Sequence, residues 1–210
     1  MIDLYTANTF NGQRATIMLE ETGLDYRAHY LTLRKGDQRQ PKFLKLNPSG
    51  RIPVLIQREF CDSTPFVLTQ SVAIVQYLAE RTRQLLLESL AERARVYEWV
   101  QFHATDISSA LFSAFYLHRL IKPAQKQAAD LLRLRVHNFY RHIDRQLGKH
   151  EFLAGSQYSI ADIITLPAVI AQQDKLTEYI HLMRWSQQLQ QRPAVQRGLS
   201  IPQPELSHEN

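Results

Sequence analysis

Residues 47–57 read "NPSGRIPVLIQ", and this stretch decides how the N-terminal part of the chain folds. Residues 47–50 are typical turn formers, and residues 54–56 are the apolar residues of a β-strand. Pro53 stands at the start of that strand and has no N–H group, so it would interrupt the hydrogen bonds of a central strand. The stretch therefore predicts a turn, then a proline at an edge position or a bend, and a strand that pairs only beyond it.

Length and composition predict a water-soluble protein with one or two cores. The chain has 210 residues, of which 44% are hydrophobic and 21% charged. No apolar run approaches the roughly 18 residues that a membrane span needs, and the N-terminus lacks the pattern of a secretory signal, so we expect a cytoplasmic protein without membrane contact. The single cysteine, Cys61, excludes an internal disulfide and the Cys-x-x-Cys redox and zinc patterns, and its place in a hairpin turn predicts no function.

The net charge of +5 does not predict nucleic-acid binding, because the basic residues are spread along the chain. The most regular group is a stripe of Arg133, His137, Arg141 and Arg145, spaced by four on an expected helix. A solvated face explains this stripe without a ligand, since a core-facing set lies opposite to it at helical spacing: Leu132, Val136, Phe139, Ile143 and Leu147.

The first eighty residues alternate between strand and helix patterns in the order βαβαββα. Gly23 is expected to end the first helix, and Pro41 to begin a short second one. The expected strands are "IDLYT" (2–6), "DYRAHYLTL" (25–33), "IPVLI" (52–56) and "PFVLT" (65–69), and the expected helices are "GQRATIMLEETG" (12–23), "PKFLKL" (41–46) and "SVAIVQYLAER" (71–81).

Strand patterns are absent after about residue 82, which predicts an all-helical second domain. A helical pattern runs from about 89 to 120, "KPA" breaks it, and another continues to about 149. Pro167 lies inside a later helical pattern and predicts a kink or an irregular turn. We therefore expect an α/β domain over residues 1–82, a linker over 83–88, an all-α domain over 89–200, and a polar tail over 201–210.

Two serines stand where helices are expected to begin. Ser159 and Asp162 have the spacing of a capping box, a structural feature rather than a catalytic one. Ser71 follows Gln70 at another helix start, where free N–H groups and the positive helix end favour a carboxylate. Taken alone, Ser71 is equally well explained as a helix cap.

Together these motifs resemble those of the cytosolic glutathione transferase family. The pattern N-P-x-x-x-I-P-V-L, then [EQ]-S-x-A-I-x-x-Y-L, then S-I-A-D-I and "RPAVQR", occurs in that order from Ile2 to about Leu199. The resemblance implies a thioredoxin-like N-terminal domain that binds glutathione, followed by an all-α domain. It also implies a homodimer.

The resemblance assigns roles to five residues. Pro53 matches the family's cis-proline, which leaves the backbone of Ile52 to bind the cysteinyl part of glutathione. Gln70 and Ser71 match the pair that holds the γ-glutamyl group, although many members have Glu where this chain has Gln70. Arg51 matches a basic residue that meets the glycyl carboxylate.

The residue that activates the thiol is expected in "YTANTFNGQ" (5–13), which contains no cysteine. Thr9 and Asn11 are the candidates, because a hydroxyl and an amide can stabilise a thiolate; Tyr5 lies too early in the strand. The arrangement resembles the bacterial Nu-class and yeast prion-like branch, in which glutathione-dependent disulfide reduction is prominent. Thr9 and Asn11 as plain loop caps remain the alternative. Further basic residues, Lys35 and Arg39, are either helpers in binding or solvated charges.

A second substrate, a small electrophile or a disulfide, is expected in a cleft between the two domains, with candidate residues from the start of the long helix. The candidates are aromatic and polar residues that core packing would explain equally well: Phe102, His103, Asp106, Phe112, Phe115 and Tyr116. Histidine and cysteine spacing predicts no metal site. A non-catalytic glutathione-binding or regulatory module on the same fold is the alternative to an enzyme, because fold does not fix function.

Overall fold

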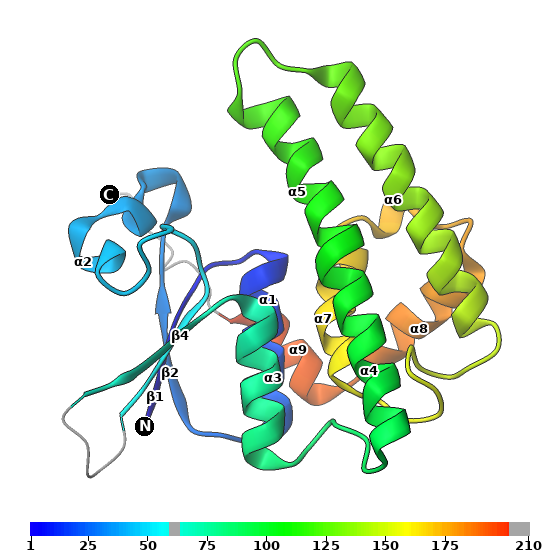
Figure 1. The fold of residues 1–210 in the computed structure, drawn as a ribbon, viewed down its shortest axis with the longest axis horizontal. Helices are drawn as coiled ribbons and strands as arrows, with labels where there is room; N and C mark the ends of the chain where they lie inside the picture. Colours follow the sequence, from blue (N-terminus) through cyan, green and yellow to red (C-terminus); the bar gives the residue numbers. More distant parts are fainter. Residues whose placement is uncertain (59–63, 202–210) are drawn as a thin grey trace, which may run out of the picture. The chain divides into compact units, whose positions relative to one another are not determined.

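The computed structural model describes residues 1–58 and 64–201 (Figure 1). The chain forms two compact units. One comprises Met1–Gln84 with the segment from Leu189 onward, and the other comprises Leu85–Gln188. Cys61 and the tail beyond Ile201 lie outside the described residues, so the expectations about them stay predictions.

The first unit is built on a four-stranded sheet in the order β2–β1–β3–β4. Strand β1 pairs parallel with β2 and antiparallel with β3, which pairs antiparallel with β4. The predicted βαβαββα order is confirmed by the elements β1 (Ile2–Thr6), α1 (Phe10–Thr22), β2 (Tyr26–Tyr30), η1 (Leu33–Lys35), η2 (Asp37–Arg39), α2 (Pro41–Leu44), β3 (Val54–Gln57), β4 (Phe66–Thr69) and α3 (Ser71–Thr82).

Both faces of this sheet are covered (Figure 1). Helices α1 and α3 pack against each other on one face, and the segment around α2 lies on the other. Because side chains alternate along a strand, Leu4 and Tyr5 point to opposite faces. Tyr5 joins the cluster on the α2 side, whose buried members are Leu31, Phe43, Val54 and Ile56.

The start and stop signals of the helices in this unit act as the sequence predicts. Gly23 ends α1 in the left-handed conformation, with a φ of 65° that favours glycine. Pro41 is the first residue of α2, where its missing N–H would have no helical partner.

The second unit is all-helical, which confirms the predicted fold class. The helical pattern expected from about 89 to 120 is confirmed, but the helix alternates between α-helical and π-helical stretches, which were not predicted. The helical elements after α3 are α4 (Leu90–Phe102), the π-helical η3 (His103–Ser108), α5 (Ser109–Phe115), the π-helical η4 (Tyr116–Leu120), α6 (Lys126–Leu147), α7 (Ile160–Ile170), η5 (Gln173–Lys175) and α8 (Ile180–Gln190).

The packing of the second unit follows the apolar pattern. Helix α6 packs against α5, and α4 against α7. Ten consecutive residues of α7, from Ile160 to Val169, are buried, and Pro167 lies within this helix. Only half of the basic stripe of α6 is solvated as expected: Arg141 and Arg145 are exposed, whereas Arg133 and His137 are half-buried and contact His118 and Tyr179. The core-facing side of α6 buries Val136, Tyr140, Ile143 and Leu147.

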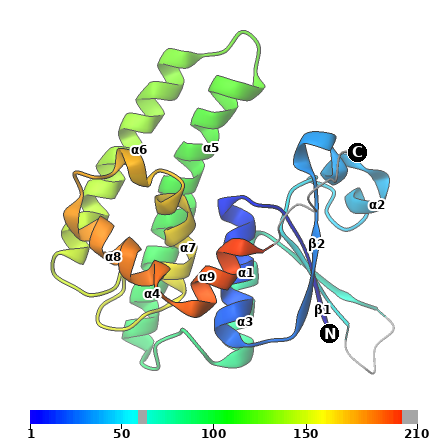
Figure 2. The ribbon, with the colours of Figure 1, turned by 180° about the vertical axis from the view of Figure 1, so that it is seen from behind.

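The last helix, α9 (Pro193–Ser200), belongs to the first unit and lies beside α1 (Figure 2). The sequence groups it with the all-α domain; the structure groups it with α1 because the two helices come into backbone contact. A Cβ atom at Gly198 would lie 2.5 Å from Cα of Ile17. The division between the units, after Gln84, falls within the expected linker.

Candidate functional site

Three segments meet at one end of the sheet in the first unit, where β3 begins and where β1 and β4 end. We call this end of the sheet the edge. Val54, the first residue of β3, pairs with Tyr5 of β1 and with Thr69 of β4. The segment before β3 and the segments that follow β1 and β4 are therefore neighbours, and these segments contain Pro53, Thr9 and Ser71. Helices α1 and α3 both begin at this edge (Figure 1).

The turn before β3 is held by Asn47. Its Oδ1 accepts a hydrogen bond from the backbone N–H of Ser49 at 3.1 Å, and its Nδ2 donates to the carbonyl oxygen of Arg51 at 2.7 Å. The Ile52–Pro53 peptide bond is cis. Strand β3 is central, between β1 and β4, and both of its ladders begin at Val54, so Ile52 lies just before them and outside them.

Thr9 is the N-cap of α1. Its Oγ1 accepts a hydrogen bond from the backbone N–H of Gly12 at 3.2 Å. Only glycine fits at position 12, because a Cβ atom there would lie 2.2 Å from the carbonyl oxygen of Ala7. Asn11 was expected in the loop, but α1 begins at Phe10, so Asn11 lies in the first turn of the helix.

Arg14 joins Asn11 to Ser71. Its Nη1 donates to Asn11 Oδ1 at 2.6 Å and lies 3.2 Å from Ser71 Oγ, and the Ser71 hydroxyl donates to Asn11 Oδ1 at 3.3 Å. The side chain of Arg14 is buried, with the residue only 2% exposed. Arg14 was not among the site residues predicted from the sequence. It follows Asn11, Gly12 and Gln13 near the start of α1, so its polar neighbours in the sequence gave no sign that it is buried.

Gln70 precedes α3 in an unusual backbone conformation. Its φ of 72° and ψ of 117° lie in a region that residues other than glycine rarely adopt. Its side chain is exposed, whereas Ser71 is only 7% exposed. Lys35 in η1 and Arg39 in η2 are both exposed, as is Arg51.

The candidates for the second substrate all lie in the second unit. The ring of Phe102 packs against Trp99 and Phe139, with ring centroids 5.5 Å apart in each pair. His103 is fully buried in η3, Asp106 is half-buried, and its Oδ2 accepts from the Thr105 hydroxyl at 2.9 Å. Three aromatic candidates are exposed: Phe112, Phe115 and Tyr116. A binding role for any of them stays a prediction.

The described part of the chain shows neither a cluster of metal-ligating side chains nor a membrane-spanning helix. Residues 1–58 and 64–201 contain no group of three or more histidine, cysteine, aspartate or glutamate side chains placed to hold a metal ion. No helix among them has both the length and the apolar character to span a bilayer.

Comparison with known proteins identifies the class. The glutathione S-transferase N-terminal domain family matches residues 11–81, and the glutathione S-transferase C-terminal domain family matches residues 105–199. The chain belongs to the glutathione S-transferase family, as its motifs predict.

Among its relatives is the disulfide-bond oxidoreductase YfcG of Escherichia coli, 32% identical over 95% of this chain and 94% of YfcG. A crystal structure of a glutathione transferase from Burkholderia graminis, with two glutathione molecules bound per subunit, has a TM-score of 0.87 and 32% identity over 97% of this chain and 89% of that one. A glutathione transferase from Pseudomonas putida, with one glutathione disulfide bound per subunit, has a TM-score of 0.86 and 31% identity over 96% and 92%.

Proposed function

We propose that this protein binds glutathione at the edge formed by Ile52, Ser71 and the start of α1, and uses its thiolate to reduce disulfides. The observation that carries the proposal is the connection of Asn11 to Ser71, whose Oγ lies 3.3 Å from Asn11 Oδ1. A residue suited to bind a carboxylate and a residue suited to bind a thiolate thus lie side by side. Relatives with bound glutathione or glutathione disulfide, and the oxidoreductase YfcG, support it.

Each part of glutathione has a matching group at this edge. The γ-glutamyl carboxylate would accept from the Ser71 hydroxyl and from the N–H groups at the start of α3, where the helix dipole favours an anion. The cysteinyl part would pair with the backbone of Ile52 as an added strand. The exposed side chain of Arg51 would meet the glycyl carboxylate.

Thr9 and Asn11 would then stabilise the sulfur. The Thr9 oxygen accepts a bond from the helix, and its hydroxyl proton can still be donated to a thiolate. Such donors lower the pKa of the thiol because they favour its charged form. They are fixed by α1, so no reorganisation is needed when the sulfur attacks.

The reaction consumes two glutathione molecules for each disulfide. The first thiolate attacks one sulfur of the substrate disulfide, forms a mixed disulfide, and expels the other sulfur as a thiolate that takes up a proton. A second glutathione thiolate attacks the glutathione sulfur of the mixed disulfide, giving glutathione disulfide and the second substrate thiol. The substrate gains two electrons, and the two glutathiones lose them.

Calorimetry with glutathione, followed by a disulfide-reduction assay, tests the proposal. Thr9→Ala and Asn11→Ala should each lower turnover about tenfold or more, the value of one hydrogen bond to a charged group, while binding of glutathione changes little. Full activity in both variants would place the activator elsewhere. Binding without turnover in the unaltered protein would favour a non-catalytic module, and absence of binding would refute the proposal.

We also propose that the protein is a homodimer, on the strength of its family membership. Analytical ultracentrifugation at micromolar concentration tests this assembly. A single monomeric species at that concentration would contradict it.

A further inference from the structure

Arg14 places a positive charge in the interior of the first unit, behind the proposed binding edge. The residue is 2% exposed, and its guanidinium carbon lies 5.5 Å from the centre of the Phe10 ring. Burying a charge costs free energy unless hydrogen bonds compensate for the lost water. The polar partners of its Nη1, Asn11 and Ser71, are the two residues assigned to the thiol and to the γ-glutamyl carboxylate.

A guanidinium group only donates hydrogen bonds, and this fixes how Asn11 is oriented. Nη1 of Arg14 lies 2.6 Å from the Asn11 side-chain oxygen, and the Ser71 hydroxyl donates to the same oxygen at 3.3 Å. An amide oxygen has two lone pairs, and these two donors occupy them. The amide N–H groups of Asn11 are therefore the end that can donate to a ligand.

We propose that Arg14 is a positioning residue that holds Asn11 with its amide N–H groups toward the glutathione thiolate. The inference rests on the proposed function and names a residue that acts through Asn11 without touching the sulfur. When a carboxylate binds Ser71, the Ser71 hydroxyl proton turns from Asn11 to the carboxylate. Arg14 then keeps the Asn11 oxygen in place, so both halves of glutathione can be held together.

The pKa of the thiol of bound glutathione is the first measurement: a role of Arg14 in folding alone would not change it, whereas loss of its positioning role or of its charge would raise it. In Arg14→Met, Asn11 is free to rotate, and the thiol pKa, followed by the ultraviolet absorption of the thiolate, should rise by about one unit, a tenfold loss of thiolate at low pH. We expect kcat to fall by a similar factor and KM to change little. Arg14→Lys, which keeps one donor and the charge, should recover part of the loss.

Gln13→Met is the matched control on the same helix. Gln13 donates to Asn8 Oδ1 at 2.9 Å on the exposed side of α1, so its replacement removes a polar side chain without altering the Asn11 contacts. The thiol pKa of this variant should equal that of the unaltered protein. An equal rise in both variants would overturn the proposed role of Arg14.

A double-mutant cycle tests whether Arg14 acts through Asn11. If it does, Arg14→Met should have almost no further effect on kcat once Asn11→Ala is present, because the group being positioned is gone. Independent, multiplying effects of the two substitutions would overturn the proposal.

Asn11→Asp keeps the test valid should Arg14→Met fail to fold. A carboxylate at this position would still accept from Arg14, so the melting temperature should be no lower than that of the unaltered protein, while the loss of the amide donor raises the thiol pKa. A much lower melting temperature would show that Arg14 does not face the oxygen. If the unaltered protein binds no glutathione, the proposed function itself fails; if it binds and Arg14→Met folds with an unchanged thiol pKa, only this inference fails.

Discussion

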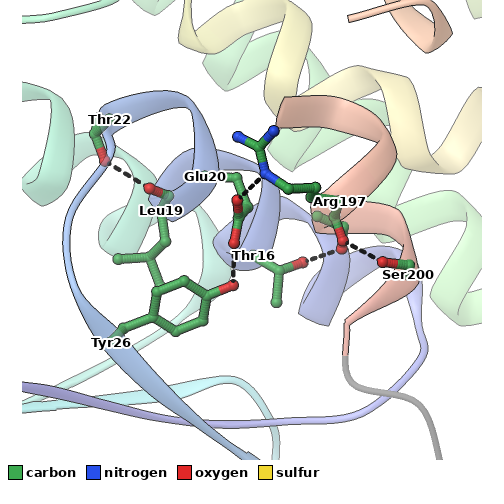
Figure 3. Close-up of polar contacts among 8 residues, drawn as sticks. Thr16, Leu19, Glu20, Thr22, Tyr26, Arg197 and Ser200 are labelled. Carbon is green, nitrogen blue, oxygen red and sulfur yellow. Dashed lines mark hydrogen bonds and ion pairs between the residues drawn. The ribbon is translucent and has the colours of Figure 1, made fainter. Parts of the chain in front are cut away.

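The hydroxyl of Thr16 donates a hydrogen bond to the carbonyl oxygen of Gly198 at 2.6 Å, across 182 residues of sequence (Figure 3). The bond joins the middle of α1 to the last helix, α9. Two ion pairs join the same helices. Arg197 Nε donates to Glu20 at 2.6 Å. Arg192 forms a bidentate pair with Glu21, in which Nε and Nη2 donate to the two carboxylate oxygens at 2.7 and 2.8 Å. The end of the described chain thus completes the unit that carries the proposed site.

Gly198→Ala should destabilise the first unit. Alanine is favoured over glycine inside a helix by about 1 kcal/mol, but its Cβ atom would lie 2.5 Å from Cα and 2.6 Å from the backbone nitrogen of Ile17. The backbones must move apart, and such overpacking typically costs about 1–3 kcal/mol. Urea unfolding measures the change.

Ser200→Ala is the control in the same helix, since it removes only an exposed hydrogen bond to the carbonyl oxygen of Arg197. Its free energy of unfolding should change by less than about 0.5 kcal/mol. An unchanged or higher stability of Gly198→Ala would mean that α9 is not held against α1.

How far the sequence predicts this fold depends on whether its signals are local. Gly23, Pro41 and the Pro53 strand start act within a few residues, and each predicts its element correctly. The grouping of α9 with α1 depends on a backbone contact at Gly198 between segments far apart in sequence, and no local pattern encodes it. The π-helical stretches within residues 103–120 were not predicted from the sequence.

In the candidate site too, local motifs are predicted from the sequence, whereas a contact between distant segments is not. The motif around Pro53 and the Gln70–Ser71 pair predict which segments meet at the edge of the sheet, and the structure brings these segments together. Arg14 is different, because a buried arginine needs hydrogen-bond partners, and one partner of its Nη1 comes from another segment. That partner, Ser71, is 57 residues away, so only the folded chain reveals the connection.

Asp162→Asn should destabilise the second unit. Oδ1 of the fully buried Asp162 accepts from the Leu153 backbone N–H at 3.0 Å and from Trp185 Nε1 at 2.9 Å, and its Oδ2 accepts from the Ser159 backbone N–H at 3.0 Å. An amide of the same shape would turn an NH₂ group toward one of these donors. Leaving a buried donor without a partner costs about 1–3 kcal/mol.

The difference in stability between Asp162→Asn and the unaltered protein should also depend on pH. Burial raises the pKa of Asp162 to about 6, above the value of about 3.9 in an unfolded chain. The folded state therefore binds the proton more tightly, and the contribution of Asp162 to stability falls as pH rises from about 4 to about 6. Denaturant curves should show a larger deficit for Asp162→Asn at pH 4 than at pH 7. Asp174→Asn, the same substitution at an exposed position, is the control.

Asp3 should give the opposite dependence in the first unit. Its carboxylate contacts His29 Nε2 and Arg58 Nη1, both at 2.7 Å, and the hydrogen bond from His29 is the main cause that holds its pKa below the usual value. A lowered folded pKa stabilises the protein above the unfolded pKa of about 4 and loses this effect as pH falls further. Asp3→Asn should therefore be less stable than the unaltered protein at pH 7 and nearly equal to it below about pH 3. A constant difference across this range would show that the ion pair does not contribute.

Gln70 offers a test of whether backbone strain at the proposed site serves binding. Its φ of 72° and ψ of 117° cost a residue with a side chain roughly 1–3 kcal/mol, and glycine would adopt them freely. Gln70→Gly should therefore be at least as stable as the unaltered protein in thermal unfolding. Its affinity for glutathione, measured by calorimetry, should fall, because the amide that would meet the γ-glutamyl amino group is lost. Gln70→Glu keeps the strain and adds the charge found in many family members, so it should bind about two- to fivefold more tightly, the value of an exposed ion pair. Equal affinity in all three proteins would remove Gln70 from the binding site and leave its strained conformation without a functional reason.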